Sequence, residues 1–145
     1  QGDFDCAYKV HKALGTGLLE KIYEVCFCHE LLKKDIPYKR QVKLPIYYDG
    51  ITFDEGLVLD ILVDDLIICE LKAQNTDSTI WQAQLLSHLK LTGNHVGFLI
   101  NFNTALIKNE QEDFAFRLSH SPYNQKEINA PIIKLNKHIF IKTNV

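Results

Sequence analysis

The sequence predicts an α/β domain in which helices flank a mixed central sheet. Two nearly continuous apolar segments, residues 57–63 and 66–71, are typical of neighbouring buried strands and are separated only by Asp64 and Asp65. Segments with apolar residues at helical spacing lie before and after this pair, and a further apolar segment follows at residues 96–102. The expected order of elements is α-β-β-β-α-β, with an extension at the C-terminus.

Three segments have the apolar periodicity of helices. Two of them, residues 4–14 and 18–34, are separated by the break Gly15-Thr16-Gly17. The third covers residues 79–91 and is expected to end at Gly93-Asn94. The sequence therefore places two helices before the central strands and one after them.

The remaining strands are shorter or less regular. Residues 44–48 predict a short strand ahead of the turn Asp49-Gly50. Beyond Asn103 the pattern weakens, but residues 110–118 favour a helix and residues 139–142 a strand. We expect these last two elements to lie outside the domain core.

Length and composition are those of one folded domain. The chain has 145 residues, of which 46% are apolar, and this is enough to bury a single core. We expect one domain over residues 1–145, with a core over residues 4–102 and a C-terminal extension over residues 103–145. No apolar segment approaches the roughly 20 residues that a bilayer span needs, so no membrane partner is expected.

The cysteines indicate a reducing compartment. Cys26 and Cys28 lie two residues apart on a predicted helix, so their side chains diverge and cannot share a metal ion. We interpret these two, together with Cys6 and Cys69, as small buried hydrophobic residues without disulfides. The expected location is the cytoplasm.

The charge of the chain does not by itself favour a nucleic-acid partner. The formal net charge is −2, whereas dedicated nucleic-acid binders are usually basic. Clustering can still produce a basic face. Two clusters are visible: Lys33, Lys34, Lys39, Arg40 and Lys43, and more weakly Lys134, Lys137, His138 and Lys142. Each cluster is either solvated surface or a contact to phosphates.

Three charged residues interrupt the central pair of strands. Asp60 lies within the first apolar segment, and Glu70 and Lys72 lie at the end of the second. Burying a carboxylate costs several kcal/mol unless the carboxylate is paired or binds a cation. Side chains alternate along a strand, so Glu70 and Lys72 are expected on the same face of the sheet.

The loop between the two strands decides whether Asp60 joins that face. A three-residue loop would be closed by Val63 opposite Ile67. It would place Asp60 directly opposite Glu70, whereas a two-residue turn would place the two carboxylates on opposite faces. A shared site therefore requires the longer loop, which we expect.

Two carboxylates and an ammonium on one face have two interpretations. They form a site for a hard cation such as Mg²⁺, beside a positive charge directed at phosphate. Alternatively, Lys72 forms a structural ion pair with Asp60 or Glu70 at the end of a strand. The spacing alone supports both interpretations equally. Paired carboxylates also serve glycosidases, but that chemistry leaves Lys72 without a role.

Four motifs give the sequence a specific resemblance. Asp60, followed ten residues later by Glu70-Leu71-Lys72, resembles the D…(D/E)xK signature of the PD-(D/E)xK nuclease superfamily. The segment Gly17-Leu18-Leu19-Glu20-Lys21-Ile22-Tyr23 resembles the motif of the GxxExxY protein family, a small bacterial branch of that superfamily. Ala83-Gln84-Leu85-Leu86 and Gly97-Phe98-Leu99-Ile100-Asn101-Phe102 are also similar to that family, in its order and at its spacing.

This resemblance implies a restriction-endonuclease-like core and a Mg²⁺-dependent nuclease, with Mn²⁺ as an alternative metal and DNA favoured over RNA. It implies catalytic roles for Glu20, Asp60, Glu70, Lys72 and Gln84, with Glu20, Asp60 and Glu70 as metal ligands. Glu20 also has a structural interpretation. If Gly17 is the helix N-cap, Glu20 is the third helical residue and its carboxylate can bond the cap.

Five further residues are candidates for contacts to nucleic acid: Lys39, Arg40 and Lys43 from the basic cluster, Tyr23, and His88. Related nucleases often carry Gln-x-x-x-Tyr on the last helix, whereas here His88 is the fourth residue after Gln84. His88 either contacts phosphate or replaces the tyrosine as a half-buried polar residue. Tyr23 lies one turn after Glu20, and its hydroxyl is expected in the cleft.

The main alternative function is a non-catalytic module that keeps the nuclease-like fold and binds nucleic acid or a protein. The net charge favours this module, whereas the intact Asp60, Glu70 and Lys72 favour the nuclease. The sequence leaves the oligomeric state open, including a homo-oligomer.

Overall fold

The central sheet of the protein has five strands in the spatial order β1-β2-β3-β4-β7. The computed structural model describes residues 2–75, 79–103, 115–116, 133–134 and 139–143. The strands are β1 (Tyr38–Tyr48), β2 (Ile51–Val63), β3 (Ile67–Lys72), β4 (Val96–Asn101) and β7 (Ile139–Thr143). β3 and β4 are parallel, and the other neighbouring pairs of this sheet are antiparallel. The predicted mixed sheet is confirmed.

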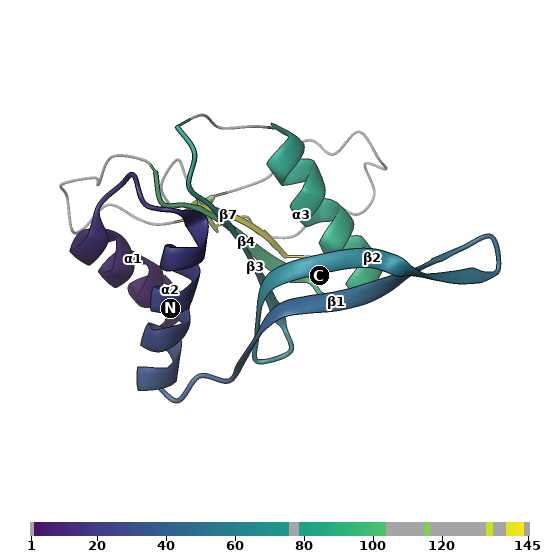
Figure 1. The fold of residues 1–145 in the computed structure, drawn as a ribbon, viewed down its shortest axis with the longest axis horizontal. Helices are drawn as coiled ribbons and strands as arrows, with labels where there is room; N and C mark the ends of the chain where they lie inside the picture. Colours follow the sequence, from purple (N-terminus) through teal and green to yellow (C-terminus); the bar gives the residue numbers. More distant parts are fainter. Residues whose placement is uncertain (1, 76–78, 104–114, 117–132, 135–138, 144–145) are drawn as a thin grey trace.

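Helices cover both faces of this sheet (Figure 1). α1 (Gly2–Leu14) and α2 (Glu20–Lys33) pack on one face, and α3 (Thr79–Thr92) packs on the other. The first core includes Phe27, Leu31, Cys69 and Leu71, and the second includes Ile68, Leu85, Leu89 and Leu99. Because Ile68 packs under α3, alternation along β3 places Glu70 and Lys72 on the α3 face as well.

The connection between β2 and β3 has the predicted three-residue loop. Val63 pairs with Ile67, Leu62 with Ile68 and Ile61 with Cys69. One further step in this register sets Asp60 opposite Glu70, but the backbone pairing ends at Ile61. The candidate carboxylates therefore lie where β2 and β3 part.

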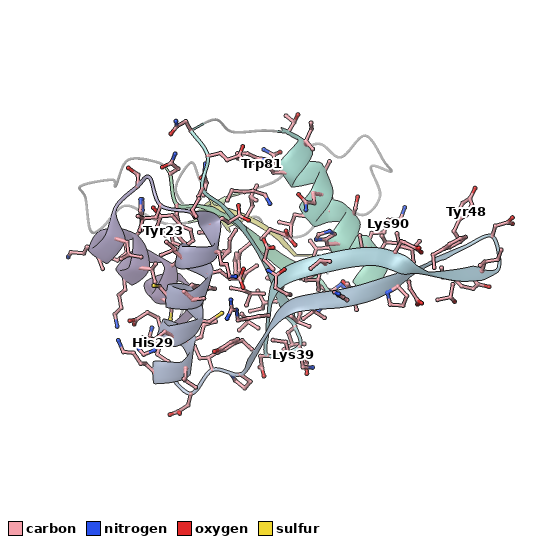
Figure 2. All side chains as sticks on the ribbon, in the orientation of Figure 1. Tyr23, His29, Lys39, Tyr48, Trp81 and Lys90 are labelled. Atoms are coloured by element: carbon pink, nitrogen blue, oxygen red, sulfur yellow. The ribbon has the colours of Figure 1, made fainter. Side chains whose placement is uncertain are left out.

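β1 and β2 form an arm that extends beyond the rest of the sheet (Figure 1). Both strands are longer than predicted, because β1 already begins at Tyr38 and β2 at Ile51. Tyr48, near the tip, is 72% exposed and projects from the arm in Figure 2. Val42 and Leu44 alternate with exposed neighbours and pack at the edge of the second core, whereas residues 47–55 around the tip are exposed. At the tip, the pairing of β1 with β2 across the Asp49-Gly50 turn defines the two strands.

The C-terminal elements are only partly as predicted. The strand expected at residues 139–142 is β7, which pairs antiparallel with β4, so the C-terminal extension adds an edge strand to the sheet. The helix expected at residues 110–118 is wrong where it falls on described residues. There, β5 (Ala115–Phe116) pairs with β6 (Ile133–Lys134), so a contact distant in sequence overrides the local pattern. The rest of that segment lies outside the described residues.

The helices within the described ranges are all too short or too polar to cross a membrane.

Candidate active site

The first part of the site is the loop that leads into α2. Gly17 has a φ of +94°, in the left-handed region that favours glycine, and its N–H donates to Asn103 Oδ1 at 2.8 Å. The Tyr23 hydroxyl donates to the Gly15 carbonyl oxygen at 2.7 Å and accepts the Leu18 N–H at 3.2 Å. These bonds hold the start of α2 next to the chain that leaves β4.

Glu20 is the first residue of α2, which corrects its predicted position. The N-cap is Leu19, and no side chain bonds this cap, so the glycine cap with Glu20 as third helical residue is wrong. Burial raises the pKa of Glu20, and the charges of Glu70 and Glu24 add to this effect, while Lys72 opposes it. The Glu20 carboxylate therefore lies near the charged groups of β3.

Asp60 lies near Glu70, where the alternation of β2 is interrupted. Leu59 packs in the core under α3, whereas Ile61 packs in the core under α2, and the charge of Glu70 acts on the Asp60 carboxylate. Asp60 Oδ2 accepts the Leu71 N–H at 2.8 Å, in place of the backbone pairing that has ended. The Asp60 side chain thus fastens the two strands where they part.

The charges around Asp60 are not balanced within the protein. The pKa of Asp60 is raised to about 6, mainly by burial and also by the negative charges of Glu70 and Glu20. The Leu71 N–H and the Lys72 ammonium lower this pKa, but not enough to offset burial and the neighbouring carboxylates. A cation bound here would relieve that repulsion.

Glu70 is the most deeply buried of these carboxylates, with 1% of the residue exposed. Its Oε1 lies 2.6 Å from Nδ1 of His88, and His88 is itself 4% exposed. Gln84 lies one turn before His88 on α3 and is partly buried. Gln84 and His88 therefore lie on the side of α3 that faces the end of β3. His88 contacts only Oε1 of Glu70, so Oε2 is left for another partner.

Two of the residues predicted to contact nucleic acid are in the interior, which corrects those predictions. Tyr23 is fully buried and stacks on Phe102 with ring centroids 4.6 Å apart, so its hydroxyl does not point into a cleft (Figure 2). His88 is buried against Glu70 and does not face phosphate. It is buried, rather than half-buried as the alternative interpretation expects.

The basic candidates lie on β1. Lys39 is exposed and pairs with Asp65 at the β2–β3 loop. Arg40 donates from Nε to Glu24 Oε1 at 2.7 Å, so part of its guanidinium is used within the protein. Lys43 is exposed. In the weaker cluster, Lys137 and His138 lie outside the described residues.

Sequence analysis missed two asparagines that support the site. Asn101 is 5% exposed, and its Oδ1 accepts the N–H groups of Gln74 and Asn103. Asn103 in turn accepts the Gly17 N–H. These bonds join the ends of β3 and β4 to the loop before α2. An asparagine at the end of an otherwise apolar strand was the available clue.

The donor set fits a hard divalent cation that keeps several waters. No three His, Cys, Asp or Glu side chains within the described part of the chain are grouped closely enough to hold a metal by themselves. Mg²⁺ usually takes only one or two protein carboxylates and completes its shell with water and substrate phosphate. Asp60 and Oε2 of Glu70 supply that number of ligands.

Comparison with known protein families shows which superfamily the chain belongs to. A family model described as the PD-(D/E)XK nuclease superfamily matches residues 3–114, which is more than half of the chain. The chain belongs to the PD-(D/E)XK nuclease superfamily. No curated protein and no solved structure matches it.

Membership in the PD-(D/E)XK superfamily agrees with the mixed sheet flanked by helices. The superfamily consists mostly of nucleases, which act on nucleic acid and generally use divalent metals such as Mg²⁺. The superfamily match spans all the residues of the candidate site, from Glu20 to His88. It also extends beyond the motifs noted in the sequence, as far as residue 114.

Proposed function

We propose that this protein is a Mg²⁺-dependent nuclease of the GxxExxY branch that hydrolyses phosphodiester bonds of DNA, with Mn²⁺ as an alternative metal. The observation that carries the proposal is that Glu20, Asp60 and Glu70 lie near enough to one another and to Lys72 to act on each other electrostatically. The pKa values of Glu20 and Asp60 are raised, as expected where the protein has brought like charges together for a cation.

The carboxylates have separate roles in this proposal. Asp60 and Glu70 Oε2 would hold the metal, and Glu20, at the start of α2, would bind it directly or through a water molecule. The chemistry that a bound Mg²⁺ supplies is a lower pKa for a coordinated water and stabilisation of charge on the phosphate oxygens. Because Asp60 is fastened to the Leu71 N–H, its second oxygen has a fixed position before any ligand arrives.

Lys72 and Gln84 act on the substrate. The Lys72 ammonium shares a face with Glu70 and acts electrostatically on both Glu20 and Asp60, so it lies within the reach of the scissile phosphate. It orients the attacking water and neutralises charge that develops on phosphate. Gln84, from α3, positions the same group by hydrogen bonds. Lys39, Arg40 and Lys43 on β1 attract the phosphate backbone.

A non-catalytic binding module is the second candidate, and the net charge of −2 favours it. This second function does not explain the charge imbalance at Asp60, because carboxylates that repel phosphate would not help a surface to bind nucleic acid. No disulfide joins the four cysteines, all of which lie among the described residues, and this supports our proposal of a cytoplasmic location.

The test is to incubate purified protein with labelled single- and double-stranded DNA and RNA in Mg²⁺, Mn²⁺ or EDTA. We expect cleavage of DNA with either metal and none in EDTA. Asp65→Asn, at an exposed carboxylate of the β2–β3 loop, is the control and should cleave normally. Binding of nucleic acid without cleavage under every metal condition would favour the module instead.

A further inference from the structure

Ordinary core packing does not explain the contact between His88 and Glu70. A polar pair this deeply buried costs free energy to desolvate, and an apolar pair of similar volume would avoid that cost. The Nδ1–Oε1 distance of 2.6 Å is that of a strong, charge-assisted hydrogen bond. The bond holds the Glu70 carboxylate in one rotation. It uses Oε1 and leaves Oε2 available.

The backbone brings His88 to this distance. Leu85 and Leu89 flank His88 along α3 and pack on β4, where Gly97 lies beneath them. A Cβ atom at Gly97 would lie 2.7 Å from Leu85 Cδ1 and 3.3 Å from Leu89 Cδ1. The absence of this atom allows α3 to approach the sheet closely. Further along α3, the Thr92 hydroxyl bonds the His88 carbonyl oxygen at 2.8 Å.

We propose that His88 is a positioning residue that holds Glu70 for metal binding by donating its Nδ1–H to Oε1. This inference rests on the proposed function. A histidine that donates to a ligating carboxylate fixes the orientation of that ligand, and loss of such a partner typically weakens metal affinity about 10- to 100-fold. His88 touches neither the metal nor the substrate, so its effect appears in metal affinity before it appears in the rate at saturating metal.

Two variants of nearly equal size separate the hydrogen bond from packing. His88→Leu removes the donor, and His88→Asn keeps an N–H donor near the position of Nδ1. Both should be measured for Mn²⁺ affinity by electron paramagnetic resonance and for the Mg²⁺ concentration that gives half-maximal cleavage. His95→Asn, at an exposed histidine just before β4, is the matched control.

We expect His88→Leu to raise the Mn²⁺ dissociation constant and the half-maximal Mg²⁺ concentration by about tenfold, with a nearly normal rate at saturating metal. His88→Asn should recover both values to within about threefold of the original protein. Equal metal affinity in the original protein and both variants would overturn the inference. So would equal weakening in both, because packing alone would then explain the effect.

A measurement on the unmodified protein covers the case in which His88→Leu does not fold. The ¹⁵N–¹H spectrum of the imidazole groups should show His88 protonated at Nδ1, with a shift that moves when Mg²⁺ is added. An unprotonated Nδ1, or a shift that Mg²⁺ leaves unchanged, would contradict the inference. Metal binding that responds to His88 in a protein that cleaves nothing would leave this inference intact and remove the proposed nuclease activity.

Discussion

Glu20 and Glu24 lie one turn apart on α2, but the protein treats their charges differently. Glu24 is 6% exposed and accepts hydrogen bonds from Arg40 Nε at 2.7 Å and Gln41 Nε2 at 2.9 Å. Both of its oxygens are therefore used by neighbours on β1. Glu20 instead lies among other carboxylates, and its pKa is raised.

The difference separates a structural carboxylate from a functional one. The Glu24 carboxylate is satisfied within the protein. The Arg40 guanidinium balances its charge, and the Gln41 amide completes its hydrogen bonds. The region around Glu20, Asp60 and Glu70 has three carboxylates for one lysine, so it keeps a negative charge that a cation can match. Burial alone would not distinguish the two regions, since both contain a deeply buried glutamate.

The largest expected effect is on cleavage, in the Asp60→Asn variant. The asparagine oxygen can still accept the Leu71 N–H, so the strands stay fastened, but the charge that binds the metal is lost. Cleavage should fall at least about 100-fold in a gel assay at saturating Mg²⁺. A variant that keeps more than a tenth of the original rate would remove Asp60 from the metal ligands.

Glu24→Gln, by contrast, should lower the stability of the protein and leave cleavage nearly unchanged. It leaves Arg40 with an uncharged partner and replaces one of the two accepting oxygens with an NH2 group, so it should lower the free energy of unfolding by about 2 kcal/mol in urea denaturation. Cleavage per folded molecule should stay within about twofold of the original. If Glu24→Gln abolishes cleavage while the protein remains folded, the division between the two regions is wrong.

Glu20→Gln should change activity more than stability. We expect cleavage about tenfold lower at limiting Mg²⁺, a higher Mg²⁺ requirement, and a change in unfolding free energy within about 1 kcal/mol. Since Glu20 is the first helical residue, a capping role cannot account for a loss of activity. Normal cleavage at limiting Mg²⁺ would leave Asp60, Glu70 and Lys72 to carry the chemistry.

The smallest effect is on the stability of the metal-free protein. The pKa of Asp60 is about 6 in the folded protein and 3.8 is its ordinary value, so the folded state binds this proton more tightly. Stability is therefore lost as the pH rises from about 4 through 6, and the loss is complete above that range. After solvent screening we expect it to be about 1–2 kcal/mol.

Asp60→Asn should remove this loss and unfold at a higher temperature than the original protein at pH 8 in EDTA. Thermal unfolding followed by circular dichroism at pH 5 and pH 8 checks the sign. A variant less stable than the original by several kcal/mol would instead support a buried ion pair at Asp60.

Much of the site could be predicted from the sequence, because strand alternation is a local rule. The three-residue loop, and with it the approach of Asp60 to Glu70, follows from counting residues in two apolar segments. The positions of Tyr23 and His88 could not be predicted in this way. Each depends on which face of a helix meets the sheet and how closely, and Gly97 sets that approach for His88. The full length of the β1–β2 arm likewise depends on strand pairing at its exposed tip, residues 47–55, rather than on burial.

The most direct test of the central claim is metal binding by the carboxylates themselves, without substrate. Isothermal titration of Mn²⁺ into the original protein, Asp60→Asn and Asp65→Asn compares a site carboxylate with an exposed one. We predict one bound Mn²⁺ in the original protein and in Asp65→Asn, and at least about tenfold weaker binding in Asp60→Asn. Equal binding by all three proteins would contradict the claim that Asp60 and Glu70 hold a metal ion with Glu20 nearby.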